Sequence, residues 1–419
     1  MISIRFIRDN VELIKQSLSN RNNNINLDEI LELDTSRRSV IQSVEALKAD
    51  RNYYSKEIAK QKQSGNNCDQ EIKKMQKVSS AIKEYDLELK QIDDELKSKL
   101  LFIPNIPHES VPKGKTEEDN VKVREWGEKP IFSFPNRDHV FLSEKHNLID
   151  FKAGAKISGS GYPLYIDRGA RLERSLINYM MDHHSSKGFK EVFPPFLVNE
   201  SSVLTTGQLP KFKDDMYYIN KDDMYCISTA EVPVTNIHRD EILDTDCFPV
   251  QYAAYSACFR REAGSYGKDT KGLLRLHQFN KVELVKFCNP ENSYQELELL
   301  LHSAEKILQE LNLHYRIIEL CTGDLSFSAA KCYDIEVWSP SEEKYLEVSS
   351  CSNFGSFQAA RGNIRYKNNG KLEHVHTLNA SGLATPRLLV AILENYQQED
   401  GTILIPEVLK KYTGFESIC

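Results

Sequence analysis

Charged residues fall inside stretches of the chain that otherwise read as apolar strands. Arg260 and Glu262 lie two residues apart at the end of one such stretch, so they share one strand face. Glu283 and Glu347 lie within two further strand-like segments, and Glu231 follows a fourth. Burying a charge costs free energy unless the charge is paired. These residues therefore need a partner within the protein or a charged ligand, and for any single residue both interpretations stay open.

The gathering of four such segments in one part of the chain favours a ligand site over isolated ion pairs. Between two of the segments, residues 264–272 contain three glycines and two lysines. We expect this stretch to form a basic hairpin loop that closes over phosphate. An ordinary solvated hairpin is the alternative.

The elements that must position these residues form a mixed fold over residues 104–419. Helices are predicted at 171–184, 294–311 and 385–397. Strands rich in β-branched and aromatic residues are predicted at 224–228, 250–259, 278–286, 314–320, 333–338 and 344–349. Because strands outnumber helices and short loops join several of them, we expect an α+β fold with an antiparallel sheet. The sequence lacks the glycine patterns of dinucleotide and P-loop sites and the G-x-S-x-G of hydrolases.

The N-terminal part of the chain has a different pattern. Residues 28–102 contain no proline and one glycine, and three prolines follow between residues 104 and 112. Apolar residues recur three or four apart across 30–58 and again across 75–96, which is typical of a coiled-coil seam. Turn-forming residues 64–67 separate the two stripes, so we predict an antiparallel hairpin of two helices, each roughly 50 Å long. A coiled coil that dimerises is the alternative.

The predicted tip of this hairpin is basic, although the whole chain is acidic. Residues 50–77 hold seven Lys or Arg and four Asp or Glu, whereas the 419-residue chain has 54 basic and 61 acidic residues and a net charge of −7. The overall charge argues against a generic nucleic-acid coat. The basic tip favours a phosphate-bearing polymer as a partner, and a solvated helix face is the alternative.

Composition excludes several classes of protein. Apolar residues are 40% and charged residues 27%, values that collagen-like and disordered chains do not have. No apolar run approaches the roughly 20 residues that span a bilayer, and the start lacks a secretory h-region, so we expect a cytoplasmic protein with no membrane partner. None of the nine cysteines forms a C-x-x-C pair, which argues against structural zinc and against a disulfide framework.

The ordered motifs resemble those of a known family. Phe259-Arg260-x-Glu262, a basic loop and His277-Gln278-Phe279 are similar to motif 2 of class II aminoacyl-tRNA synthetases, at about 257–283. Gly382-Leu383-Ala384-x-x-Arg387 resembles motif 3, at about 382–397, and residues 171–195 resemble motif 1. Thr229-Ala230-Glu231, the run 347–354 and the N-terminal hairpin narrow the resemblance to seryl-tRNA synthetases of bacterial or organellar type.

This resemblance implies two domains and a reaction. A tRNA-binding coiled-coil arm would occupy 1–103, and a class II catalytic domain would occupy 104–419. The implied reaction is ATP-dependent activation of L-serine to seryl-adenylate, followed by transfer to tRNA(Ser) and also to tRNA(Sec). The family also implies a homodimer formed through motif 1, with the arm reaching tRNA on the partner subunit. Because no segment is left over for an editing domain, we expect threonine to be refused by size.

The resemblance also implies roles for individual residues. Arg260 and Arg387 are the expected catalytic residues, on the α- and γ-phosphates of ATP. Phe279 would stack on adenine, and Glu262 would accept a hydrogen bond from its amino group. Glu347 and Ser350 are the expected ligands of Mg²⁺. The full ATP-binding set is Arg260, Arg261, Glu262, Phe279, Glu347, Val348, Ser349, Ser350 and Arg387. The L-serine set is Thr229, Ala230, Glu231, Glu283 and Ser381.

The chain departs from the usual pattern of that family at four places. Ser356, Ala360 and Ala380 stand where Asp, Arg and Gly are usual, and Thr385-Pro386 replaces a smaller pair. A proline is tolerated in the first turn of a helix. The missing arginine at 360 puts a secondary contact in doubt rather than the main phosphate ligands.

Two other functions are weighed against this one. A ligase that charges a carrier protein would share the catalytic core, but such relatives usually lack the long arm and carry Cys/His zinc ligands. A non-catalytic relative would have lost phosphate-binding arginines or metal-binding acids, whereas Arg260, Glu262, Glu347 and Arg387 are all present.

Overall fold

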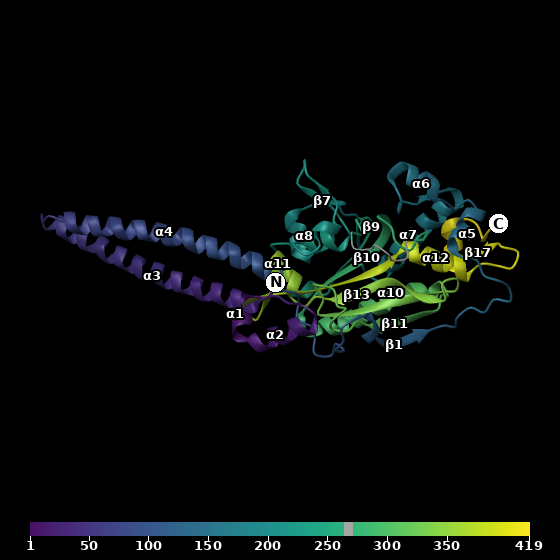
Figure 1. Ribbon diagram of the computed structural model, residues 1–419, viewed down its shortest axis with the longest axis horizontal. Helices are drawn as coiled ribbons and strands as arrows, with labels where there is room; N and C mark the ends of the chain where they lie inside the picture. Colours follow the sequence, from purple (N-terminus) through teal and green to yellow (C-terminus); the bar gives the residue numbers. More distant parts are fainter. Residues whose placement is uncertain (264–270) are drawn as a thin grey trace. The chain divides into compact units, whose positions relative to one another are not determined.

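The computed structural model describes residues 1–263 and 271–419. Most of the basic loop predicted at 264–272 therefore lies outside the described residues. The chain divides into two compact units (Figure 1). One consists of residues 2–19 and 23–104, and the other consists of Met1, residues 20–22 and residues 105–419.

The first unit is a helical hairpin preceded by two short helices, α1 (Ile4–Asp9) and α2 (Val11–Asn20). Its arms are α3 (Leu27–Gln63) and α4 (Asp69–Leu100), which lie side by side in Figure 1. Helix α3 begins where the Asn26 side chain accepts a hydrogen bond from the Asp28 amide, which satisfies one free N–H of the first turn. The turn between the arms passes through Gly65, whose φ of +71° favours glycine. The predicted antiparallel hairpin is confirmed.

Apolar contacts and ion pairs hold the two arms together. The buried seam consists of Ile30, Val40, Val44 and Ile58 from α3 and Ile82, Leu96 and Leu100 from α4. Arg37 occupies a seam position and pairs with Asp93 of the other arm, and Lys99 pairs with Glu29 at 2.9 Å. Arg51, which the pattern also placed on the seam, is exposed, because a guanidinium is costly to bury.

The second unit is built on a sheet with strand order β1-β11-β12-β13-β16-β10-β9-β4. Every pair in it is antiparallel except β4 with β9. The predicted antiparallel α+β fold is thus confirmed. The bounds of its strands are β1 (Val121–Trp126), β4 (Lys190–Val192), β9 (Val250–Phe259), β10 (Gln278–Cys288), β11 (Tyr315–Glu319), β12 (Lys331–Ser339), β13 (Lys344–Asn353) and β16 (His376–Ala384).

Strand β16 lies between β13 and β10, yet the sequence pattern did not predict it. Its residues Asn379, Ala380 and Ser381 are small or polar, and such residues lack the β-branched signature of a strand. Gly382 to Ala384, expected to open a helix, instead end this strand. Helix α12 (Thr385–Asn395) begins one residue later, with Pro386 in its first turn.

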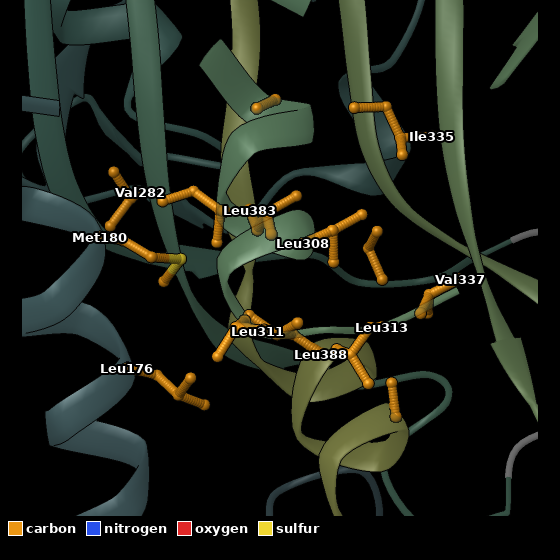
Figure 2. Close-up of a cluster of buried hydrophobic side chains, with 14 of the residues drawn as sticks. Leu176, Met180, Val282, Leu308, Leu311, Leu313, Ile335, Val337, Leu383 and Leu388 are labelled. Carbon is orange, nitrogen blue, oxygen red and sulfur yellow. The ribbon is translucent and has the colours of Figure 1, made fainter. Parts of the chain in front are cut away.

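Three helices cover one face of this sheet: α7 (Asp167–Ser186), α10 (Ser293–Glu310) and α12. Figure 2 shows part of the core between these helices and the sheet. Leu176 and Met180 of α7 and Leu308 of α10 belong to this core, on the apolar face of the sheet. Even-numbered Val282 and Leu284 of β10 belong to this core. Alternation along the strand therefore sends Lys281 and Glu283 to the opposite face.

Shorter elements cover that opposite face. Ala230, Val234 and Ala359 pack there against Val285 and Phe287 of β10. They belong to or adjoin α9 (Glu231–Thr235) and α11 (Phe357–Gly362), and α8 (Glu200–Thr206) packs on both. Other elements are α5 (His139–Lys145), α6 (Phe151–Ser158), α13 (Glu407–Thr413), β2 (Ile149–Asp150) with β3 (Leu164–Tyr165), β5 (Leu197–Asn199) with β7 (Met224–Cys226) and β6 (Tyr218–Ile219), β8 (Ile242–Leu243) with β14 (Arg365–Asn368) and β15 (Lys371–His374), and β17 (Ile403–Leu404) with β18 (Ser417–Ile418). No helix in the described part of the chain has the length and apolar character needed to cross a membrane.

Candidate active site

An irregularity in β13 brings two predicted metal ligands to one face of the sheet. Glu347 and Ser350 are three residues apart, so a regular strand would point them to opposite faces. The pairing of β12 with β13 shifts at this point: Ile335 faces Ser349, and the next residue of β12, Glu336, faces Glu347. β13 thus has one extra residue here, which is a β-bulge. As a result, Glu347 and Ser350 both line the same cleft.

A second bulge lies in β16, opposite the predicted serine-binding strand. Lys281 of β10 pairs with Ala384, whereas Glu283 pairs with Ser381, so β16 has an extra residue between them. Leu383 takes up this residue with a φ of +118° and is fully buried. Ser381 and Ala384 consequently line the same cavity, although they too are three apart.

Two adjoining cavities open beside these bulges, with volumes of about 620 and 130 Å³. The larger one includes Thr229 and Glu231, and the smaller one includes Phe279, Val348 and Arg387. Residues that line both cavities are Arg260, Glu262, Arg275, Lys281, Glu347 and Ser381. A third cavity of about 780 Å³ shares Arg275, Glu347 and Arg387 with the smaller one.

Two buried carboxylates lie at the floor of the larger cavity: Glu231 lines it, and Glu283 lies beneath it in contact with the lining residues Thr229, Lys281 and Asn379. Glu231 is 7% exposed and Glu283 is 1% exposed. The Asn379 side-chain amide donates to both of them, at 2.9 Å in each case. Gln358 donates to the other oxygen of Glu231 at 2.6 Å, and the Thr229 hydroxyl donates to Glu283 at 3.0 Å. The carboxylates are therefore held in place by donors from three different segments of the chain.

A buried lysine completes this floor. Lys281 is 6% exposed and forms an ion pair with Glu283, two residues along the same strand. Burial and the neighbouring charge of Glu283 raise the pKa of Glu231 to about 7. The pocket is polar and negatively biased, which suits a small cationic group that also carries hydrogen-bonding atoms.

The smaller cavity has an aromatic and cationic wall. The Arg260 guanidinium lies 5.0 Å from the centre of the Phe279 ring, which is a cation–π contact. Glu262, with a φ of +51°, forms an ion pair with Arg275 at 2.9 Å between Oε2 and a guanidinium nitrogen. A flat ring beside a fork of cationic donors is the arrangement that an aromatic base with phosphates would match.

The second predicted catalytic arginine lies across the same cavity. Arg387 follows Pro386 in the first turn of α12, and its guanidinium donates to the backbone oxygen of Glu347 at 2.9 Å. A longer contact of 3.4 Å joins it to the Glu347 carboxylate. Arg260, Glu347 and Arg387, which are 40 or more residues apart in sequence, thus line one cavity.

The surroundings of Glu347 and Ser350 fit a hard divalent cation. Asp334 of β12 is the pairing partner of Ser350, and burial together with the charge of Glu347 raises the pKa of Asp334 well above its ordinary value. Two carboxylates and a hydroxyl at one place offer the oxygen ligands that Mg²⁺ prefers, and a cation there would relieve the repulsion between them. Among the described residues, no group of three or more His, Cys, Asp or Glu is arranged as a metal site by itself.

Four predicted residues, Ala230, Arg261, Glu283 and Ser349, do not line these two cavities. Ala230 is fully buried, and the Ser349 hydroxyl points to the backbone oxygen of Ser381, at 2.6 Å. Arg261 anchors its segment through the backbone, since its amide donates to Asp215 at 3.0 Å. The side chains of Ala230, Ser349 and Arg261 therefore support the predicted binding residues rather than form the cavity walls.

Sequence reasoning did not name several residues that shape the site. Lys281 carried a signal, because it alternates with Phe279 and Glu283 along one strand. Asn379 lies in the unpredicted strand β16, and Gln358 lies in α11, so neither had a pattern to mark it. Arg275, which precedes β10, lines all three cavities.

Among the positions that depart from the family pattern, Pro386 lines the smaller cavity, and the others lie outside the walls of both cavities. Ser356 precedes α11 and Ala360 lies within it, while Ala380 faces the apolar core. Thr385 is fully buried and donates to Glu173 and to the backbone oxygen of Asn280. Arg361, next to Ala360, donates to the backbone oxygens of Leu204 and Leu209.

Comparison with known proteins agrees with this geometry over the full chain. Residues 1–107 match the family model of the seryl-tRNA synthetase N-terminal domain, and residues 212–396 match that of the class II tRNA synthetase core domain (G, H, P, S and T). A serine--tRNA ligase of Chloroherpeton thalassium is 53% identical over 426 residues, covering 100% of both chains.

Solved structures show the same similarity. Seryl-tRNA synthetase of Pyrococcus horikoshii, solved in complex with ATP, has a TM-score of 0.94 and 39% identity, covering 100% of this chain and 99% of its own. Cytoplasmic serine-tRNA ligase of Naegleria fowleri, solved with AMP, has a TM-score of 0.88 and 28% identity, covering 98% and 96% of the two chains.

Proposed function

This chain belongs to the seryl-tRNA synthetase family, and on that premise we propose that its cleft joins ATP to L-serine and serves tRNA(Ser). In the first step, a serine carboxylate oxygen attacks the α-phosphorus of ATP. The new O–P bond forms as the bond to the bridging oxygen breaks, and pyrophosphate leaves with that electron pair. In the second step, a hydroxyl of the terminal adenosine of tRNA attacks the seryl carbonyl, and AMP leaves. The observation that carries this proposal is the meeting of Arg260, Glu347 and Arg387 beside the acidic pocket.

The first step needs positioning and charge stabilisation more than proton transfer. A carboxylate is already ionised at neutral pH, so it needs no general base. Arg260 holds the α-phosphate and Arg387 the γ-phosphate, because a planar guanidinium binds two phosphate oxygens at once. Phe279 stacks on adenine, and Glu262 accepts from its amino group. Fixed donors of this kind lower the barrier where negative charge develops.

The nucleotide also requires a divalent cation in this proposal. Glu347 and Ser350 would hold Mg²⁺, with Asp334 as the neighbouring carboxylate, whose pKa is raised by burial and by the charge of Glu347. When bound, the ion supplies neutralisation of phosphate charge. Glu347 would thereby serve both the cation and Arg387, whose guanidinium contacts its backbone oxygen and its carboxylate.

The acidic pocket selects the amino acid. Glu231 and Glu283 accept hydrogen bonds from the ammonium and hydroxyl of serine, and Thr229 and Ser381 line the same space. Alanine lacks the side-chain hydroxyl, so the buried polar groups of the pocket would lose a hydrogen-bond partner. Alanine therefore binds poorly. Threonine adds a methyl group that the walls refuse by size.

The first domain, residues 1–103, binds the tRNA in this proposal. All seven basic residues of 50–77 are exposed: Arg51, Lys56, Lys60, Lys62, Lys73, Lys74 and Lys77. Exposed Lys and Arg at the tip of the hairpin offer contacts to tRNA phosphates. The same arm would accept tRNA(Sec), and the domain of 104–419 would pair with a second copy through motif 1 as a cytoplasmic homodimer.

The decisive experiment is amino-acid-dependent exchange of pyrophosphate into ATP. Serine, threonine, alanine and glycine are compared side by side with the purified full-length chain and Mg²⁺. We expect exchange with serine at least 100-fold faster, as kcat/KM, than with alanine, because the unmatched hydroxyl site costs roughly 3 kcal/mol or more. A folded sample that shows no serine-dependent exchange would reject the proposed function.

A further inference from the structure

The floor of the larger cavity has an unequal number of fixed charges. Glu231 and Glu283 lie together with a single buried cation, Lys281, which is paired with Glu283. Arg260 lines the same cavity, but its guanidinium lies over Phe279. Buried carboxylates without a cation are costly, so one negative charge on this floor remains to be balanced.

The two carboxylates differ in the donors that they bind. Glu283 accepts from Asn379 at one oxygen and from Thr229 at the other, where Lys281 also binds. Glu231 accepts hydrogen bonds from two neutral amides, those of Gln358 at 2.6 Å and Asn379 at 2.9 Å. Charge-assisted contacts stabilise an ionised carboxylate more strongly than neutral donors do, so Glu283 is the better stabilised anion of the two.

We propose that Lys281 is a positioning residue that cancels the charge of Glu283, so that the ammonium of serine is the second cation of the pocket and its binding is coupled to ionisation of Glu231. This inference rests on the proposed function and deepens it. When the ammonium enters, Glu231 releases a proton to solvent, and the pocket then holds two anions and two cations. Lys281 acts through Glu283 and Glu231 and is not itself a catalytic residue.

The groups that face Glu231 set the direction of the pH dependence. Burial and Glu283 favour its protonated form, whereas Gln358 of α11, Lys281 of β10 and Arg260 favour the ionised form. The resulting pKa of about 7 means that the free protein contains both forms at neutral pH. Only the ionised form attracts the ammonium, so the KM for serine falls as pH rises. With a midpoint near 7, the fall is about tenfold between pH 6 and pH 8.

The test compares wild type with Lys281→Met and Lys281→Arg by serine-dependent pyrophosphate exchange from about pH 6 to pH 8.5. Methionine keeps the length of the side chain and removes its charge, so Glu231 should retain its proton more tightly beside Glu283. We expect the midpoint of the KM profile for serine to move up by about one pH unit or more. Lys281→Arg should restore a profile close to wild type.

A merely structural lysine gives a different result. Loss of such a lysine would change the stability or all kinetic constants together. A pH profile of the KM for serine that keeps the wild-type midpoint in Lys281→Met would overturn the inference. If Lys281→Met does not fold, the double variant Lys281→Met/Glu283→Gln removes both charges and should lower the midpoint below that of wild type, because Glu283 acts on Glu231 more strongly than Lys281 does. A midpoint that does not fall would overturn the inference equally.

Wild-type calorimetry provides a separate measurement. Serine binding near pH 7 in buffers of different ionisation enthalpy should release a fraction of a proton, and serine binding without proton release would contradict the coupling. Failure of this inference remains distinguishable from failure of the proposed function. In the first case serine-dependent exchange persists with an unshifted pH profile, and in the second there is no serine-dependent exchange.

Discussion

Arginine is the side chain on which the proposed nucleotide chemistry depends most. Arg260 and Arg387 approach the smaller cavity from the end of β9 and the start of α12. Both guanidiniums already have partners within the protein, the Phe279 ring for Arg260 and Glu347 for Arg387. These contacts hold flexible side chains near the phosphate positions, so less conformational entropy is lost when ATP binds.

Arg260→Ala should abolish most of the first step. Loss of one pre-organised donor to a developing charge costs about 3 kcal/mol or more, which is roughly 100-fold in kcat of pyrophosphate exchange. Arg260→Lys should recover part of the rate, because a lysine supplies charge without the planar fork. Arg168→Ala provides a control, since Arg168 contacts the backbone oxygen of Ser417 instead. Equal rates for Arg260→Ala and the control would contradict the role of Arg260.

At the scale of elements, one buried carboxylate ties the three motifs together. Glu173 of α7 is 5% exposed and accepts hydrogen bonds from Asn280 of β10, at 2.8 Å, and from Thr385 at the start of α12. Asn280 in turn accepts from the Tyr255 hydroxyl of β9 at 3.0 Å. Phe279 lies next to Asn280 on β10, and Arg387 lies near Thr385 on α12, and both line the smaller cavity. By binding Asn280 and Thr385, Glu173 therefore fixes the distance between these two strand and helix positions.

Glu173→Ala should therefore raise the KM for ATP and lower the free energy of unfolding. Asn280 and Thr385 would each lose a buried acceptor, at a cost of about 1–3 kcal/mol for each unsatisfied group. Glu310→Gln is the matched control, because Glu310 also accepts a hydrogen bond from α7, through Tyr179 at 2.8 Å, on a part of the helix remote from those motifs. Denaturant unfolding and pyrophosphate exchange measure both effects. An equal rise in the KM for ATP in both variants would contradict a specific role of Glu173 in positioning β10 and α12.

At the scale of the whole molecule, the chain separates chemistry from polymer recognition. The cavities belong entirely to the unit of residues 105–419, whereas the exposed basic tip belongs to the hairpin of α3 and α4. The hairpin buries a narrow seam between its own two arms. The two steps of the proposed reaction should accordingly be separable by deletion.

Replacing residues 35–97 with a short glycine-serine link should spare adenylate formation and cripple tRNA charging. The Lys99–Glu29 pair at the base of the hairpin is retained, which preserves the remaining helical turns. We expect pyrophosphate exchange within about twofold of wild type and a fall in kcat/KM for tRNA on the order of 100-fold or more, because phosphate contacts are lost. Charging of tRNA that survives the deletion unharmed would show that the arm has another role.

A charge variant of the full-length chain separates loss of contacts from loss of the fold. Lys73→Gln/Lys74→Gln keeps the hairpin and should weaken tRNA charging with a shallower dependence on salt, since fewer counterions are released. Helix content by circular dichroism should stay unchanged because both lysines are exposed.

The amino-acid sequence by itself determined the coiled-coil hairpin, the antiparallel α+β class and the residues of the proposed site. These follow from local periodicity, turn residues and motif order, which neighbouring residues encode directly. The local pattern did not show which of those residues would line the same cavity in the folded protein. Glu347 and Ser350 should lie on opposite faces of a regular strand, and only the bulge in β13 places both in the cleft.

Tertiary structure alone decided the remaining parts of the site. β16 is held as a strand by pairing with β10 and β13 rather than by its own small residues, and it brings Asn379 between Glu231 and Glu283. Burial by surrounding elements, rather than residue type, raises the pKa of Glu231. Pairing register and desolvation depend on contacts between distant segments, and for that physical reason they appear only when the chain is folded.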